Sequence, residues 1–458
     1  MKKSKLITGV VFLFVYFMIC RSYAFNSPKA ISNIHFWGYQ IQSINVQGVS
    51  NTLAKSSYDM LVIEPTRTDW SSNDKNFDTH ALVETLKNSK SSDAAYRKLV
   101  IAYIDIGEAE DWRWYWTWSE EWPKGAPKPA DWPDYIVARD PDGWGGNYPV
   151  AFWDSDWKDI VIYGNNHPTN SERNYTSIID EVIKDGFDGI YLDWVEAFED
   201  SDVIAAASSA GKDSAVEMIK FINEMRAYAT NFNPDFLIIQ QNAASLCSGH
   251  PELFSTIDAI AQEGIWFEGK ATDNWNDRKG YDIINPSDTI NYYLNYLSQY
   301  KTASVPVFDC EYALFNAWDG YSNSYSKGYI PYCTRRSLGQ LTTTPPPGYS
   351  VDTNNVIVLK SDFIKYKDRK KVDVLKFKDV TPDGLEQKFQ NNGAIGILDG
   401  DTLEVFYWPQ KLESKRGGKV WKYKKKKDAV IKYIPKNNKL IIKLWKQMPT
   451  NRIIYVID

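Results

Sequence analysis

Short apolar runs alternate with helical patterns through the first two thirds of this 458-residue chain. The run Gly189-Ile190-Tyr191-Leu192 is uniformly apolar, which is typical of a parallel strand that helices cover on both faces. Before it, apolar residues recur at helical spacing through 178–183, and Asp185-Gly186 provides a helix stop. The same reading predicts strands at 35–39, 60–64, 99–106, 135–138, 189–193, 236–240, 259–263 and 306–311.

Eight strands alternating with helices, within about 310 residues, predict a (β/α)8 TIM barrel. An open doubly wound sheet is the alternative. We favour the barrel because an open sheet usually has fewer strands, and because no glycine-rich phosphate loop follows a strand.

Acidic or amide residues follow the apolar part of several predicted strands. If the barrel forms, these side chains converge on one rim, where such barrels hold their active sites. Closely placed carboxylates repel, so one can stay protonated while another ionises. That division of labour suits a glycosidase, which needs a proton donor and a carboxylate that attacks or activates water. The residues concerned are Glu64, Asp105, Glu108, Asp193, Asn242, Glu263 and Glu311.

Aromatic residues give a second indication of sugar binding. The chain has 18 Trp and 29 Tyr, and five of the Trp lie between Trp112 and Trp122, after the third predicted strand. Flat aromatic rings cover the apolar faces of sugar rings. We expect most of these tryptophans to pack loops against the barrel and the others to line a substrate groove.

Composition changes at Thr342–Gly348, a linker-like stretch with three prolines. Residues 346–458 hold 24 basic and 13 acidic residues, a formal charge of +11, whereas residues 1–345 hold 29 basic and 45 acidic ones, a charge of −16. We therefore expect a barrel over 25–345 and a small all-β accessory domain over 346–458. Its lysine run at 422–427 either contacts an anionic glycan or blunts a sheet edge, and we favour the edge.

Residues 1–24 have the pattern of a secretory signal peptide: lysines, an apolar run and small residues before a cleavage point. Cys20 could mark a lipoprotein, but the residues before it match that cleavage box poorly. No later stretch is apolar and long enough to span a membrane. We expect a secreted or periplasmic protein.

The remaining cysteines, Cys247, Cys310 and Cys333, allow one disulfide at most, and Cys310–Cys333 is a candidate. The scattered Cys and His residues predict no metal site. We therefore expect neither a cofactor nor a nucleic-acid partner.

Four stretches together resemble glycoside hydrolase family 114, over roughly residues 33–342. They are Tyr103–Arg113, Gly186–Glu199, Gln262-Glu263 and Lys327–Tyr332. The resemblance implies a (β/α)8 barrel of the endo-α-1,4-polygalactosaminidase kind, acting on galactosamine-containing polysaccharide. Such polymers are cationic when deacetylated, and an acidic barrel would attract them.

By that resemblance, Asp193 and Glu263 match the catalytic pair, on what we number as strands five and seven. We assign Glu263 as the general acid, because the apolar residues 265–267 could desolvate it, and Asp193 as nucleophile or base. Glu268 and Glu311 are alternative acids. A non-catalytic glycan-binding barrel remains the second hypothesis. Predicted substrate-binding residues are Asp105, Glu108, Trp194, Asn242 and Glu311.

Overall fold

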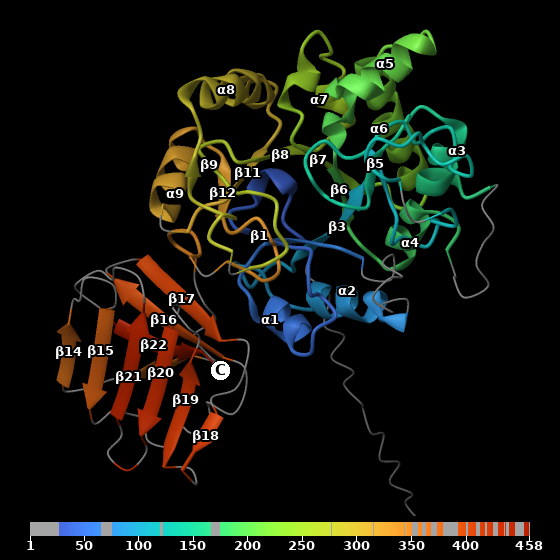
Figure 1. Ribbon diagram of the computed structural model, residues 1–458. Coiled ribbons are helices and arrows are strands. Elements are labelled where there is room, and N and C mark those ends of the chain that lie inside the picture. Colours follow the sequence, from blue (N-terminus) through green and yellow to red (C-terminus); the bar gives the residue numbers. More distant parts are fainter. Residues whose placement is uncertain are drawn as a thin grey trace, which may run out of the picture.

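The computed structural model describes residues 27–65, 76–119, 122–165, 175–275, 277–314, 316–342 and 344–349, and strands between 356 and 457. The predicted signal peptide lies outside the described residues. Eight parallel strands form one sheet, with helices around it, which confirms the predicted (β/α)8 barrel (Figure 1). In sheet order they are β1 (Trp37–Gln40), β2 (Met60–Ile63), β3 (Leu99–Asp105), β6 (Gly189–Asp193), β7 (Leu237–Gln241), β8 (Ala259–Glu263), β11 (Val307–Glu311) and β12 (Ile330–Cys333).

One predicted strand was wrong and another was missed. Residues 135–138 form no barrel strand; Ile136 makes only an isolated antiparallel bridge to Val150. The eighth strand is instead β12, at the end of the barrel sequence. Asp193 and Glu263 therefore end the fourth and sixth strands of the barrel, not the fifth and seventh.

Several of the described barrel helices begin where a short polar side chain accepts hydrogen bonds from free backbone amides. Asp78, Ser177, Asp200 and Asp213 cap α2, α4, α5 and α6 in this way. The helices of the described barrel are α1 (Val49–Lys55), α2 (Thr79–Lys87), α3 (Ser155–Lys158), α4 (Ile178–Lys184), α5 (Ser201–Ser209), α6 (Ser214–Thr230), α7 (Leu253–Thr256), α8 (Ser287–Thr302) and α9 (Ala317–Ser326). None of the described helices is long and apolar enough to cross a membrane.

The first and last strands meet through side chains inside the barrel. Trp37 donates from Nε1 to the Ile330 carbonyl at 2.9 Å, and its ring lies 5.6 Å from that of Tyr332. Above it, the rings of Tyr39 and Tyr191 lie 5.1 Å apart. These buried aromatic rings fill the interior, so the barrel is a packed core whose free space must lie at its rims.

At the N-terminal face, three aspartates immediately before strands tie neighbouring strands together. Asp59 accepts from the amides of His35 and Phe36, Asp188 from that of Val100, and Asp258 from that of Ile238. Each aspartate also pairs with a base: Lys29 with Asp59 at 2.9 Å, Arg97 with Asp188 at 2.8 Å and Arg226 with Asp258 at 2.7 Å. These three aspartates each have a basic partner, and their contacts stabilise the fold.

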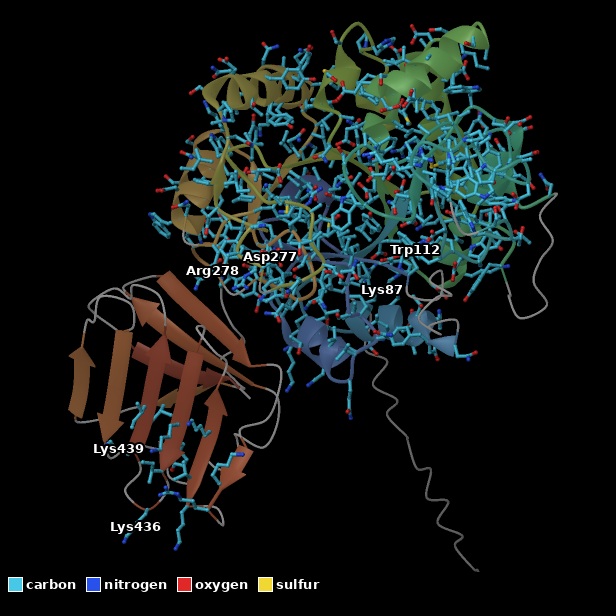
Figure 2. The ribbon with its side chains drawn as sticks, viewed as in Figure 1. Lys87, Trp112, Asp277, Arg278, Lys436 and Lys439 are labelled. Atoms are coloured by element: carbon cyan, nitrogen blue, oxygen red, sulfur yellow. The ribbon has the colours of Figure 1, made fainter. Side chains whose placement is uncertain are left out.

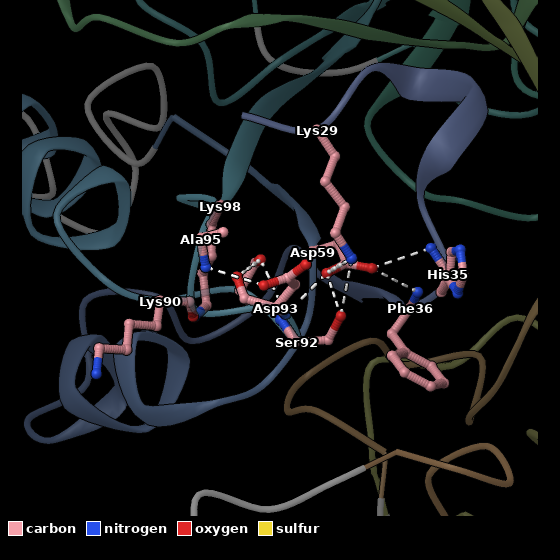
Figure 3. Close-up of polar contacts among 10 residues, drawn as sticks. Lys29, His35, Phe36, Asp59, Lys90, Ser92, Asp93, Ala95 and Lys98 are labelled. Atoms are coloured by element: carbon pink, nitrogen blue, oxygen red, sulfur yellow. Dashed lines mark hydrogen bonds and ion pairs between the residues drawn. The ribbon is translucent and has the colours of Figure 1, made fainter. Parts of the chain in front are cut away.

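Figure 3 shows the contacts of Asp59, which join Lys29, Ser92 and the two amides. These hydrogen bonds and the Lys29 charge hold the pKa of Asp59 below its usual value, against the effect of burial. The N-terminal segment is therefore fastened to the base of the barrel.

The C-terminal strands form two antiparallel sheets, of four and six strands. This agrees with the predicted all-β character, while the boundary near residue 345 remains a prediction. The four-stranded sheet contains β13 (Val356–Leu359), β22 (Ile453–Ile457), β16 (Gly393–Asp399) and β17 (Thr402–Trp408). The six-stranded sheet contains β14 (Phe363–Lys367), β15 (Asp373–Lys378), β21 (Lys439–Leu444), β20 (Ala429–Ile434), β19 (Val420–Lys424) and β18 (Glu413–Lys415).

Cys247, Cys310 and Cys333 are buried and free. The candidate Cys310–Cys333 disulfide is therefore absent from the structure. The register of β11 and β12 explains why, because it sets Cys310 opposite Tyr332 and pairs Cys333 with Glu311.

Lys98 is the least expected residue at the base of the barrel, since its side chain is fully buried. Its ammonium donates to the carbonyl oxygens of Ala54, at 3.3 Å, and Lys90. Burial lowers the pKa of Lys98 to about 7. A lysine in the unfolded chain titrates near ~10.4. Between these values the unfolded chain binds more protons, so Lys98 makes the stability of the protein rise with pH.

We expect Lys98→Met to remove this pH dependence. Relative to the wild type, the free energy of unfolding of the variant should be highest below pH 7. It should then fall by about 2–4 kcal/mol as the pH rises from 7 to 10. Denaturant unfolding of both proteins at several pH values measures the difference. Lys90→Met, at an exposed lysine nearby, is the control. Parallel pH profiles for Lys98→Met and wild type would contradict the assignment.

Candidate active site

Asp193 ends β6 and lies at the centre of the acidic rim. Its Oδ2 accepts a hydrogen bond from the Tyr103 hydroxyl, and its Oδ1 accepts one from the Trp194 amide at 2.8 Å. Burial, together with the charge of Glu263, raises the pKa of Asp193 to about 6 although both hydrogen bonds oppose the rise. Asp193 is thus a carboxyl whose two oxygens are both fixed and whose protonation changes near neutral pH.

Glu263 ends β8 and is 5 % exposed. Its Oε2 accepts from Arg336 Nη1 at 3.1 Å, whereas its Oε1 has no hydrogen-bond partner among the described residues. Arg336 also donates to the Tyr312 hydroxyl at 3.0 Å, which fixes the guanidinium. One oxygen of Glu263 is therefore anchored and the other is free to meet a ligand.

Asn242, which follows β7, connects the strands that carry the two acids. Its Oδ1 accepts from the Glu263 amide at 2.8 Å and from Gln262 Nε2 at 3.0 Å. Hydrogen bonding to Asn242 also favours the charged form of Glu196, in the 3-10 helix Val195–Glu199 after β6. Substrate contact, which sequence analysis predicted for Asn242, stays a prediction; in the structure its side chain holds the end of β8.

The backbone is strained where it leaves β6 and β7. Trp194, Asn242 and Ala243 are non-glycine residues in the left-handed region, with φ of 53°, 52° and 52°. Such strain gathers at functional sites, where the surrounding structure holds it. Gly107 is needed beside Trp194, because a Cβ there would lie 2.2 Å from the Trp194 carbonyl oxygen.

Asp105 and Glu108 form a second acidic pair next to Asp193. Asp105 lies opposite Asp193 in the β3–β6 register, and its Oδ1 accepts from the amides of Gly107 and Glu108. Burial and the neighbouring acids raise the pKa of Asp105. Burial also raises the pKa of Glu108 to about 9, against the hydrogen bond donated by Asn147 at 3.0 Å. The structure thus places both predicted residues beside the catalytic candidate.

Several buried oxygen atoms at this rim have no hydrogen-bond partner among the described residues. They are Glu263 Oε1, Glu108 Oε1, Glu196 Oε2 and Tyr191 Oη. Buried polar groups are nearly always paired in folded proteins, so an unpaired set in one place indicates a ligand site. Charge interactions connect the set, because Asp193 raises the pKa of Glu108, Glu196 and Tyr191 alike.

Glu311 lies apart from this set. It is fully buried, and its two oxygens accept hydrogen bonds from the amides of Ile265, Trp266 and Phe267, at 2.6–3.2 Å. Its role in the structure is to shape the loop after β8. Contact with substrate, which sequence analysis predicted for Glu311, has no support in this arrangement. The backbone amides of residues 265–267 hold Glu311, and the predicted desolvation of Glu263 by their side chains stays a prediction.

Most aromatic rings of the tryptophan-rich loop pack against other rings of the protein. Trp116 lies 4.8 Å from Trp132 and 4.9 Å from Trp118 by ring centroids, and Tyr148 stacks on it at 5.3 Å. Trp144 differs, since the Arg336 guanidinium lies 5.9 Å from its ring. This confirms the expectation that most rings pack the loops.

Sequence reasoning missed Arg336 and the role of Tyr103. Arg336 follows β12, the strand that was not predicted, so its place on the rim could not be inferred. Tyr103 stands in a quoted motif, two residues before Asp105. Strand periodicity puts these two on the same face, and that signal could have directed Tyr103 into the barrel.

We expect Tyr103→Phe to raise the pKa of Asp193 above 6, by about one unit, because a hydrogen bond to the charged form is lost. Carboxyl NMR titration of the wild type, the variant and Asp193→Asn, which assigns the signal, measures the change. Tyr135→Phe, in the tryptophan-rich region, is the control. An unchanged or lowered pKa in Tyr103→Phe would contradict the assigned contact.

Comparison with known proteins gives a family for this arrangement. The chain is 31% identical over 329 residues to an uncharacterised protein of Methanocaldococcus jannaschii, covering 69% of this chain and 81% of the relative. The glycoside hydrolase domain of PelA from Pseudomonas aeruginosa is 16% identical, with a TM-score of 0.42 over 66% of this chain and 95% of that one. Ega3 of Aspergillus fumigatus, solved with galactosamine, is 13% identical, with a TM-score of 0.44 over 69% and 96%. Residues 29–348 match the sequence profile of glycoside-hydrolase family GH114, and the chain belongs to that family.

Proposed function

We propose that this glycoside hydrolase is exported and cleaves internal α-1,4 linkages of galactosamine-containing polysaccharide, with Asp193 and Glu263 as its catalytic carboxyls. The observation that carries the assignment of the pair is their unequal environment. Asp193 has both oxygens held by donors, while Glu263 has one held and one free.

Asp193 is the nucleophile or base in this proposal. Its two hydrogen bonds favour the ionised carboxyl, and with a pKa of about 6 it is largely charged at neutral pH. The donor Tyr103 remains protonated, because burial raises the pKa of its hydroxyl. As the pH falls below about 6, Asp193 takes up a proton, and kcat/KM is therefore expected to fall.

Glu263 is the general acid, through its free Oε1. A proton on that oxygen can reach a glycosidic oxygen without breaking an existing hydrogen bond, while Arg336 keeps the other oxygen in place. The desolvation of Glu263 by the side chains of residues 265–267 stays a prediction, and the assignment does not depend on it. Support comes from the unpaired Oε1 and from the position of Glu263 close to Asp193.

An amino-sugar substrate is favoured by the surplus of acids at the rim. Burial and neighbouring acids raise the pKa values of Asp105, Glu108 and Glu196, that of Glu108 to about 9, so Glu108 is largely neutral at pH 7 in the free protein. A bound ammonium group would stabilise their charged forms and displace protons. Acetylated sugars carry no such charge.

We expect Asp193→Asn and Glu263→Gln each to lower hydrolysis of galactosamine-containing polymer by about 100- to 10,000-fold, while polymer binding is retained. Each substitution keeps the shape of the side chain and removes its charge or proton. Mass spectrometry of released oligosaccharides measures the loss. Asp235→Asn and Glu252→Gln, at exposed acids, are the matched controls. Activity near wild type in either catalytic variant would overturn the pair. A wild type that binds the polymer without cleaving it would favour the glycan-binding alternative.

Binding of deacetylated polymer to the Asp193→Asn variant should release protons at pH 7, because the ammonium groups lower the pKa of the rim acids. Calorimetry in two buffers of different ionisation enthalpy measures the number released. The fully acetylated polymer is the control and should release fewer protons. Equal release with both polymers would remove the support for an amino-sugar substrate.

A further inference from the structure

The six-stranded sheet of the C-terminal region has two faces of opposite character. One face carries a row of apolar residues that the register places opposite one another across β19, β20, β21 and β15, namely Trp421, Tyr433, Leu440 and Phe377. Tyr433 and Leu440 are 1 % and 0 % exposed. This is the inner face of the sheet.

The other face carries lysines at the alternate positions. One register row crosses β19, β20, β21, β15 and β14 through Lys422, Lys432, Ile441, Lys376 and Lys365. The side chains of Lys422 and Lys432 are partly exposed, as is that of Lys439 at the start of β21. Figure 2 shows Lys439 and the exposed Lys436 near the turn between β20 and β21. We call this the lysine face.

A second row repeats the pattern two residues further along the strands. It joins Lys424, Val430, Lys443, Val374 and Lys367. Neighbouring strands lie about 4.8 Å apart and alternate residues about 6.8 Å apart. Lysines on adjacent strands or at alternate positions of one strand are therefore within the Debye length of about 8 Å at physiological salt, and those separated by an apolar residue, about 9.6 Å apart, are only slightly beyond it.

This arrangement costs stability, because like charges directly opposite in a sheet repel. Lys422 faces Lys432 on one side and Glu413 of β18 on the other, and Lys376 faces Lys365, so the two Lys–Lys pairs are only partly offset by one acid. Blunting of a sheet edge, the explanation favoured on the sequence for the run at 422–427, is wrong for Lys422 and Lys424, whereas Lys365 does lie on an edge strand, β14. β19 lies between β18 and β20, and β20, β21 and β15 are also internal strands. A ligand of opposite charge would relieve the repulsion.

We propose that the lysine face binds an acidic polysaccharide and so holds the enzyme on an anionic matrix. Lysine supplies point charges that suit the dispersed carboxylates of such a polymer. Bases of nucleic acids stack on aromatic rings, but the register places Trp421, Tyr423 and Tyr433 on the opposite face. The proposal does not depend on the proposed substrate of the barrel.

The test uses the full chain with all four lysines of the first row changed to Gln (Lys365, Lys376, Lys422 and Lys432). We expect its affinity for polygalacturonate at low salt to fall about tenfold or more, and the wild-type affinity to fall steeply as salt rises. The charge-conserving Lys→Arg set should bind within about threefold of wild type. A matched control changes four exposed lysines outside this sheet, Lys55, Lys90, Lys124 and Lys327, to Gln and should also keep its affinity.

Wild-type affinity in the fourfold Gln variant would overturn the proposal. So would tighter binding of duplex DNA or of anionic lipid vesicles than of polygalacturonate under the same conditions. The single change Lys432→Glu provides a second test if the fourfold variant does not fold. It sets opposite charges across β19 and β20, so its melting temperature should be equal or higher while its affinity falls. Unchanged affinity in this stably folded variant would also overturn the proposal.

Discussion

Parallel hydrogen bonding obliges all eight barrel strands to end on the same face, and the chemistry of the molecule depends on this constraint. The sheet can close only if β1 meets β12, where the Trp37 indole reaches the Ile330 carbonyl. Closure brings side chains distant in sequence, such as Tyr103 and Arg336, to one rim. There burial, together with the like charge of Glu263, raises the pKa of Asp193.

The two faces of the barrel use the same residue type for opposite purposes. Before the strands, Asp59, Asp188 and Asp258 each have a basic partner and backbone donors. After the strands, Glu108 and Glu263 each retain an unpaired buried oxygen. The paired aspartates of the first face stabilise the fold, whereas the unpaired acids of the second face are unfavourable for it. This division is expected where a barrel holds its reactive groups at one end.

Much of the barrel and of its acidic rim could be predicted from the sequence, because buried parallel strands have a strong local pattern of apolar residues. Gly189–Asp193 and Ala259–Glu263 were predicted with the bounds observed. Ile330–Cys333 was missed because a short run containing proline gives little evidence of a central strand. Residues 135–138 have the apolar pattern of a strand without its pairing. Glu311 could not be interpreted locally, since its partners lie in a different loop. Pairing across strands, not composition, separates the lysine face from a blunted edge.

The attachment of the N-terminal segment also determines how the enzyme could be immobilised. Lys29, His35 and Phe36 are fastened to Asp59 at the base of the barrel, on the face away from Asp193 and Glu263. Anything joined upstream of Lys29 therefore leaves the barrel from its rear. A bead or a surface coupled there would leave the rim that carries Asp193 and Glu263 open to a long polymer.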